Sequence, residues 1–244
     1  MTGSALRYRR VLLKLSGEAL MGAAGFGVDP GRLDRFAGEL AQVAAAGVGL
    51  GLVVGGGNFL RGATLAGSGV DRVTGDQMGM LATVMNGLAM RDALRRRGCA
   101  ARLYSAFGIE SVCERYTRDQ AVAALESGAV ALFAGGTGNP FFTTDSAASL
   151  RAVEIGAEIL FKATKVDGIY TADPLTDPSA TRFDHLTYDE AVRRDLKVMD
   201  LTAILLCRDH GLPLRVFDAF AGGNLMRAVR GEDVGTLVDT GEGA

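Results

Sequence analysis

The sequence predicts an α/β protein built around a mainly parallel β-sheet. Short apolar runs typical of buried strands alternate with amphipathic stretches of helical period, which is the pattern of an α/β domain. Glycine-rich turns follow several of the apolar runs directly. The 244 residues contain no internal repeat, low-complexity tract or long linker, so we expect one continuous domain with two lobes across a cleft.

The predicted elements follow one another in α/β order. Asp29 is placed as the N-cap of the first long helix and Pro30 in its first turn. We expect an ordered excursion over residues 166–178, which are rich in Asp, Gly, Thr and Pro. The predicted strands are residues 11–15, 48–54, 101–104, 129–133, 159–162, 214–217 and 236–238. The predicted helices are residues 30–46, 71–97, 117–126, 145–155, 188–193 and 201–210, with a short one after Gly223.

Composition excludes several classes of protein. Hydrophobic residues make up 48% of the chain and charged residues 22%, as in an ordinary folded globule, and no apolar run reaches 18 residues. The net charge of −2 gives no electrostatic case for nucleic acid or anionic membrane. Cys99, Cys113 and Cys207 are far apart, which favours a reducing compartment over a disulfide framework or zinc site. The two histidines, His185 and His210, stand in no triad-like arrangement, so histidine-based hydrolase chemistry is not expected.

Three glycine-bearing turns are the candidate ligand-binding segments. They span residues 14–17, residues 55–58 with Arg61 just beyond, and residues 135–140 running into 143–145. Such turns expose backbone N–H groups at helix N-termini, where phosphate oxygens are favoured. Each turn alone could be a tight βα connection that needs glycine for backbone reasons only. Three together, with Lys, Arg, Ser and Thr nearby, favour phosphate binding.

These turns are not the common nucleotide-binding motifs. No Gly-Lys dipeptide occurs, so a Walker A loop is absent, and no turn fits the dinucleotide fingerprint G-x-G-x-x-G. Of 26 basic residues only four are lysine: Lys14, Lys162, Lys165 and Lys197. Lys14 ends an apolar run before a Ser-Gly turn, and we expect its ammonium to project into the cleft at the carboxyl edge of the sheet. The alternative is a lysine that merely extends from a strand end to solvent.

Six segments together resemble the bacterial UMP kinases. The resemblance runs in unbroken order from Tyr8 to Val238. Its most specific segment is residues 136–145, Gly-Thr-Gly-Asn-Pro-Phe-Phe-Thr-Thr-Asp. The others are residues 13–20, residues 55–58 with Arg61 and Gly62, residues 75–86, residues 162–168 and residues 196–200. The resemblance implies the amino-acid-kinase fold, a three-layer αβα sandwich.

The resemblance also implies an activity and an assembly. Family members transfer the γ-phosphoryl group of ATP, with Mg²⁺ bound to the ATP, to UMP, which gives UDP and ADP in pyrimidine nucleotide biosynthesis. The implied protein is cytoplasmic and a homohexamer built from dimers, often activated by GTP and inhibited by UTP. The implied organisation is a single domain over residues 1–244, with an acceptor-binding lobe of roughly residues 1–160 and an ATP-binding lobe of roughly 161–244.

Site residues follow from the same resemblance, position by position. Asp145 would orient the catalytic lysine, and no metal ligands are expected from the protein itself. The expected catalytic residues are Lys14, Asp145 and Arg61. The expected ATP-binding residues are Lys14, Leu15, Ser16, Gly17, Gly57, Arg61, Thr164, Tyr170 and Asp173. The expected UMP-binding residues are Gly56, Asp76, Thr137, Gly138, Asn139, Pro140, Phe141, Phe142, Thr143 and Thr144. The segment associated with GTP is Gly22, Ala23, Ala24, Gly25, Phe26 and Gly27.

Two other functions remain as alternatives. One is a kinase of the same fold that acts on a carboxylate or carbamate, and the other is a non-catalytic binder of nucleotides or oxyanions. A carboxylate acceptor would leave the third phosphate-suited turn and Asp76 without a purpose. Asp200 also has two interpretations, a functional residue or the N-cap of the helix that begins at Leu201.

Overall fold

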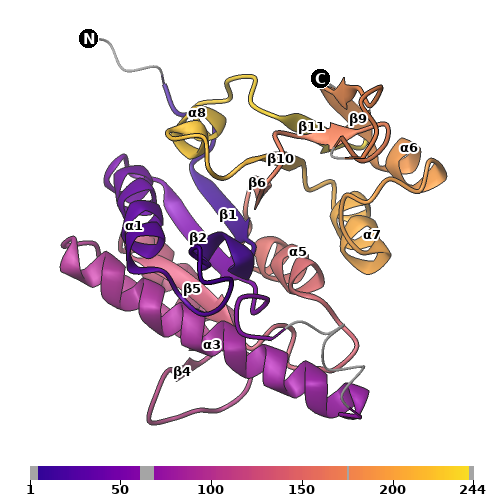
Figure 1. Ribbon diagram of the computed structural model, residues 1–244. Helices are drawn as coiled ribbons and strands as arrows, with labels where there is room; N and C mark the ends of the chain where they lie inside the picture. Colours follow the sequence, from indigo (N-terminus) through magenta and orange to yellow (C-terminus); the bar gives the residue numbers. More distant parts are fainter. Residues whose placement is uncertain (1–4, 61–68, 175, 242–244) are drawn as a thin grey trace.

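A single nine-stranded sheet forms the centre of the molecule (Figure 1). The computed structural model describes residues 5–60, 69–174 and 176–241. The strand order is β4-β3-β5-β2-β1-β6-β10-β11-β9, and within this sheet only β10 and β11 pair antiparallel. The strands are β1 Arg10–Leu15, β2 Gly49–Val54, β3 Ala101–Ser105, β4 Glu114–Arg115, β5 Val130–Ala134, β6 Ile159–Thr164, β9 His185–Thr187, β10 Leu214–Asp218 and β11 Thr236–Asp239. A separate hairpin pairs β7 Ile169–Tyr170 with β8 Arg182–Phe183.

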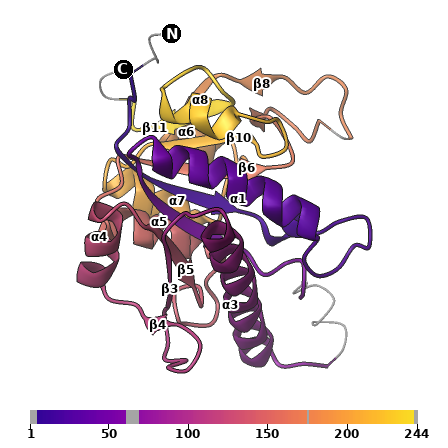
Figure 2. The same cartoon turned by 90° about the vertical axis from the view of Figure 1, so that its left-hand side faces the viewer.

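Helices cover both faces of the sheet, so the predicted three-layer αβα sandwich is confirmed (Figures 1 and 2). One face carries α1 Pro30–Ala45, α3 Arg72–Arg96 and α8 Asn224–Val229. The other carries α4 Arg118–Glu126, α5 Thr144–Glu154, α6 Tyr188–Arg193 and α7 Leu201–Asp209. Strand residues alternate between the layers: Leu13 packs toward α1, whereas Leu12 packs toward α5. In the described part of the chain, no helix is long and apolar enough to cross a membrane.

Local sequence signals explain where the helices begin. Asp29 caps α1 as predicted, because its Oδ1 accepts from the backbone N–H of Arg32 at 2.8 Å, with Pro30 in the first turn. Asp71 caps α3 through the backbone N–H groups of Val73 and Thr74. The longer predicted elements are all present, with ends displaced by a residue or two. The two- and three-residue strands were not predicted, because so few residues carry no readable alternation.

The sheet order places a crevice at the carboxyl end of β1. The chain runs from β1 to β2 on one side, whereas β6, on the other side of β1, is reached only after β5. Ligands of open parallel sheets bind beyond the carboxyl ends of strands at such a reversal. The three glycine-bearing turns follow β1, β2 and β5, so they lie along this one edge.

A buried pair of asparagines fixes the turn after β2. Asn58 and Asn86 exchange side-chain hydrogen bonds of 2.9 and 2.7 Å. Asn86 also donates to the carbonyl of Gly55 at 2.7 Å, and Asn58 donates to the carbonyl of Gly27 at 2.9 Å. Both side chains are buried, so each amide depends on these protein partners for its hydrogen bonds. The pair therefore ties helix α3 and the 22–27 loop to the glycine turn.

Asn86→Ala tests this link. The change removes the two hydrogen bonds that Asn86 donates, to Gly55 and Asn58, and the one that it accepts from Asn58. The Asn58 amide and the Gly55 carbonyl then lack these partners. We expect the free energy of unfolding to fall by about 1–3 kcal/mol for each buried polar group left unpaired. Urea unfolding followed by circular dichroism measures it. Asn139→Ala is the matched control, because among the described residues that exposed amide donates within its own turn, to the carbonyl of Thr137. An equal loss in both variants would show that the buried pair is not a fixing point.

Candidate active site

Two lysines and one carboxylate form the charged centre of the crevice. β1 and β6 pair in parallel register with Lys14 opposite Lys162. Strand alternation turns both side chains to the α5 side of the sheet, the side on which Leu12 packs. Asp145, in the first turn of α5, forms an ion pair with each lysine. Its Oδ1 lies 2.7 Å from Lys14 Nζ, and its Oδ2 lies 2.7 Å from Lys162 Nζ. All three side chains are at most 15% exposed.

Burial and charge act in opposite directions on these groups. Burial raises the pKa of the Asp145 carboxyl, but Lys14 and Lys162 outweigh it and hold that pKa below the ordinary value of 3.8. Burial lowers the pKa of Lys162 below its ordinary 10.5; Asp145 opposes that shift and Lys14 adds to it. With both lysines protonated, two positive charges face one negative charge. These three side chains then carry a net positive charge, which suits a phosphate ligand, and the Asp200 carboxylate adds a negative charge close enough to act on Lys162.

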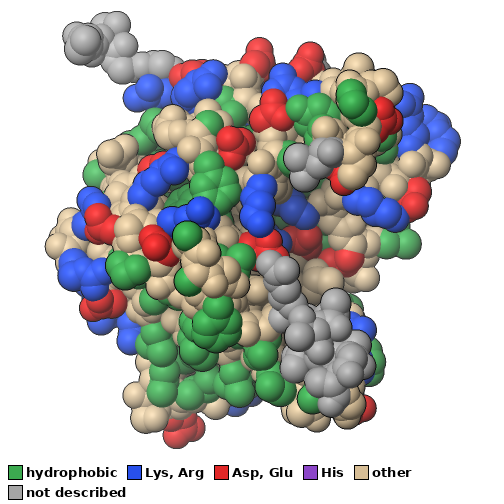
Figure 3. All heavy atoms as spheres, in the orientation of Figure 1, with side chains coloured by type: hydrophobic (Ala, Val, Ile, Leu, Met, Phe, Trp, Pro, Cys, Tyr) green, Lys and Arg blue, Asp and Glu red, His purple; other side chains and the backbone are tan. Residues whose placement is uncertain are grey.

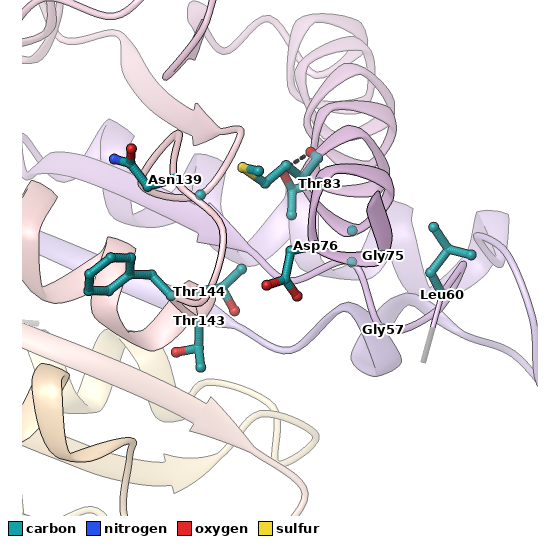
Figure 4. A pocket seen from close by; sticks show the side chains of 13 residues that line it. Gly57, Leu60, Gly75, Asp76, Thr83, Asn139, Thr143 and Thr144 are labelled. Atoms are coloured by element: carbon teal, nitrogen blue, oxygen red, sulfur yellow. Dashed lines mark hydrogen bonds between the residues drawn. The ribbon is translucent and has the colours of Figure 1, made fainter. Parts of the chain in front are cut away.

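A first pocket, of about 160 Å³, lies between α3 and the turns after β2 and β5 (Figure 4). Asp76 projects into it from α3, and Thr143 and Thr144 face it from the start of α5. Its lining residues are Gly56, Gly57, Leu60, Gly75, Asp76, Gly79, Met80, Thr83, Gly136, Asn139, Phe142, Thr143 and Thr144. Six residues of the UMP-binding prediction line it: Gly56, Asp76, Asn139, Phe142, Thr143 and Thr144. Thr137, Gly138, Pro140 and Phe141 belong to the same loop but do not line the pocket.

Asp76 holds the rim of this pocket in place. Its Oδ2 accepts from the backbone N–H of Phe141 at 2.7 Å, and Arg72 Nε donates to both carboxylate oxygens at 3.0 and 2.9 Å. Phe141 has a φ of 73°, a left-handed conformation that is uncommon for a bulky residue. Its exposed ring lies 5.6 Å from the Arg72 guanidinium. A carboxylate can accept about four hydrogen bonds, so Asp76 keeps capacity for a ligand.

Glycine is required at two turns by close backbone approach. A Cβ on Gly17 would lie 2.3 Å from the carbonyl oxygen of Gly55. A Cβ on Gly56 would lie 2.8 Å from the carbonyl oxygen of Gly79 in α3. A backbone requirement for glycine is therefore present at both positions. It does not compete with ligand binding, because the same tight packing brings the turns together at one edge.

A second pocket, of about 500 Å³, lies on the far side of Lys162. It contains Thr164, Tyr170 and Asp173, the three residues expected to hold the adenosine part of ATP. Tyr170 donates to Asp167 at 2.6 Å, and Asp167 pairs with Arg182 at 3.0 Å, which fixes the β7–β8 hairpin at the pocket wall. The remaining lining residues are Lys162, Val166, Gly168, Ile169, Thr171, Ala172, Pro174, Arg194, Asp195, Leu196, Lys197, Val198 and Val216.

Three other predictions of site residues have different outcomes. Leu15 turns its side chain away, into the apolar layer under α1, so only its backbone can face the crevice. Arg61, predicted to be both catalytic and ATP-binding, lies outside the described residues. Phe26, in the predicted GTP segment, is 65% exposed and packs edge-on against Phe59.

The sequence did not assign three contributors to this centre. Lys162 pairs with Asp145 as closely as Lys14 does, and its retention in an arginine-rich chain was the available signal. The carbonyl of Val198 accepts from Lys162 Nζ at 2.5 Å. Ser146 joins Asp200 at 2.9 Å. A backbone carbonyl and a buried serine carry no sequence signal of such roles, because many residues could supply them.

Comparison with known proteins defines the class. The sequence model of the amino acid kinase family matches residues 9–218, and the chain belongs to that family. The chain is 60% identical over 241 residues to the uridylate kinase of Pseudomonas putida, covering 99% of this chain and 98% of that protein. It is 60% identical over 233 residues to the uridylate kinase of Marinobacter nauticus, covering 96% of each.

Solved structures agree with the sequence relatives. The crystal structure of UMP kinase from Bacillus anthracis superimposes with a TM-score of 0.93 at 38% identity, covering 96% of this chain and 97% of that one. Uridylate kinase from Archaeoglobus fulgidus superimposes with a TM-score of 0.72 at 28% identity, covering 93% and 99%. The family resemblance read from the sequence is therefore confirmed.

Lys14→Arg tests whether the shape of the cation matters. The lysine ammonium is a compact charge that fits between β1 and Asp145, whereas the arginine fork is larger and planar. We expect kcat to fall by about 10²–10³ although the charge is kept, a loss typical of removing one electrostatic contact to a transition state. Steady-state kinetics measure kcat, and calorimetry and circular dichroism should show UMP binding and folding unchanged. A near-normal kcat would show that Lys14 is structural, and the catalytic cation would then be Lys162 or Lys165.

Proposed function

We propose that this protein transfers the γ-phosphoryl group of ATP to UMP, forming ADP and UDP. The observation that carries the proposal is the Lys14–Asp145–Lys162 centre between two pockets. Asp145 follows Thr144 of the first pocket, and Lys162 lines the second. A cationic centre that joins two pockets suits transfer between two phosphorylated substrates. The uridylate kinase relatives, which span nearly the whole chain, support UMP as the acceptor.

The chemistry needs positioning and charge neutralisation rather than a general base. The acceptor is itself a phosphate whose second pKa is about 6, so it is largely ionised at neutral pH and is a competent nucleophile. In phosphoryl transfer, most catalysis comes from alignment and electrostatic stabilisation. Lys14 and Lys162 reduce the repulsion between the two anionic substrates, and Asp145 holds the lysines in place. Mg²⁺ enters as part of the Mg–ATP substrate and neutralises further phosphate charge.

The residue roles belong to the same proposal. UMP occupies the first pocket, against Asp76, Thr143 and Thr144, and ATP occupies the second, against Thr164 and Tyr170. The acceptor lobe is then roughly residues 1–160 and the ATP-binding lobe roughly 161–244. GTP and UTP are proposed regulators, and the 22–27 loop is the proposed GTP segment, tied to the turn after β2 through Asn58. A cytoplasmic location fits the three free cysteines.

A coupled assay of ADP release decides among the functions. UMP, CMP, dUMP and aspartate are supplied in turn with Mg–ATP. We expect turnover with UMP well above that with the other three. Turnover with aspartate would favour the carboxylate kinase. No turnover with any acceptor, in a protein that binds ATP by calorimetry, would favour the non-catalytic binder.

Asp76→Asn tests the acceptor pocket. We expect Asp76 to accept a hydrogen bond from the nucleotide sugar, and losing a charged acceptor costs about 1.5–3 kcal/mol. The KM for UMP should therefore rise at least about tenfold, while the KM for ATP stays nearly constant. Initial rates at varied UMP and ATP give both constants. An unchanged KM for UMP would remove Asp76 from the acceptor site.

A homohexamer built from dimers is proposed as the assembled state. Leu81 and Met85 on α3 are each 49% exposed, and hydrophobic side chains gather on the lower face of the molecule in the region of this helix (Figure 3). A contiguous apolar patch of this kind favours contact with another protein surface, and a second copy of the chain fits the family. Light scattering at micromolar concentration should give a hexamer mass, and a monomer mass would contradict the proposal.

A further inference from the structure

The carboxylate of Asp200 joins two helices at the edge of the active site. Asp200 Oδ1 accepts from the backbone N–H of Ala203 at 3.1 Å, which caps α7. The same oxygen accepts from Ser146 Oγ at 2.9 Å, and Oδ2 accepts from Thr143 Oγ1. Ser146 and Thr143 both belong to the start of α5. One carboxylate therefore satisfies donors from α5 and α7 together.

These bonds close a ring around the catalytic carboxylate. Thr143 Oγ1 accepts from the backbone N–H of Asp145 at 3.0 Å, which caps α5. Asp145 binds Lys162 at 2.7 Å, and Lys162 donates to the carbonyl of Val198 at 2.5 Å. Val198 is two residues before Asp200, whose side chain returns to Thr143. The ring thus contains two carboxylates: Asp145 binds the lysines, and Asp200 completes the ring through its bond to Thr143.

The ring also passes through both pockets. Thr143 lines the first pocket, and Lys162 and Val198 line the second. Helix capping alone needs only the bond to Ala203, and the two hydroxyl bonds go beyond that requirement. Hydrogen bonds to a charged acceptor are short and strong, so the three contacts fix the positions of both helix starts.

We propose that Asp200 is a positioning residue that couples the two pockets. It holds Thr143 on one side and, through the Val198 segment, Lys162 on the other, so that Asp145 and the lysines keep their alignment as either substrate binds. The inference rests on the proposed function, because it assigns the pockets to UMP and ATP. Asp200 itself contacts no reacting atom in this assignment.

Asp200→Asn is the first test. Asparagine remains a good N-cap, but its amide has one acceptor oxygen where the carboxylate has two. It cannot accept from Ala203, Ser146 and Thr143 in the native arrangement. We expect kcat to fall at least about tenfold, with each KM within about threefold of wild type.

The second readout is thermodynamic coupling. Calorimetry gives the factor by which a non-hydrolysable ATP analogue changes the Kd of UMP; such factors are typically about 5–150. In Asp200→Asn this factor should move toward one by at least about fivefold. Ser146→Ala keeps the cap and the charge and should shift kcat and the factor in the same direction by less. If Asp200→Asn does not fold, Ser146→Ala alone tests the proposal.

Thr117→Ala is the matched control. Thr117 caps α4, a nine-residue helix like α7, and neither pocket is lined by α4. The control should lower the melting temperature without changing kcat or the coupling factor.

The inference is wrong if Asp200→Asn or Ser146→Ala keeps the wild-type kcat and coupling factor, or if the wild-type coupling factor is one. It is also wrong if Thr117→Ala lowers kcat and the coupling factor as much as Asp200→Asn does. Failure of the proposed function looks different, because wild-type protein would then turn over no UMP.

Discussion

Most of the site depends on one electrostatic constraint: two lysines face each other across neighbouring strands with a single carboxylate between them. Adjacent strands lie about 4.8 Å apart, so Lys14 and Lys162 would repel one another without an anion. Asp145 supplies that anion from α5 and binds both. The β1–β6 register, the start of α5 and the cap at Thr143 must therefore all be correct together. A one-residue slip in β1 would turn Lys14 to the opposite face of the sheet.

The same constraint gathers two ammonium groups at the place where the proposed function puts the substrate phosphates. Within residues 5–60, 69–174 and 176–241, no group of three or more His, Cys, Asp or Glu could hold a metal ion. The positive charge of the centre comes from Lys14 and Lys162, which lie at the same edge of the sheet as the glycine-bearing turns. Because both lysines are largely buried, their field is screened less by salt than that of a surface pair.

Much of the fold and part of the site could be predicted from the sequence. The central strands are predicted by apolar runs in the sequence. Asp29 and Pro30 predict the start of a helix, which the structure confirms. Lys14 and Asp145 were expected to act together, and they do meet at 2.7 Å. Lys162 was not assigned, because its role depends on the strand register, which only the folded sheet reveals. Asp200 was left between a cap and a functional residue; it is a cap that also binds α5, and no sequence pattern states the second contact.

The left-handed backbone of Phe141 has a consequence for the loop that borders the acceptor pocket. That conformation costs a residue with a side chain roughly 1–2 kcal/mol, so the local backbone preference is against the observed shape. The bond to Asp76 and the contact with Arg72 oppose that preference. The carboxylate that holds the loop also faces the pocket, so the side chain available to a ligand there also sets the position of the loop. The shape of this border therefore depends on one ion-paired carboxylate more than on the backbone preference of Phe141 itself.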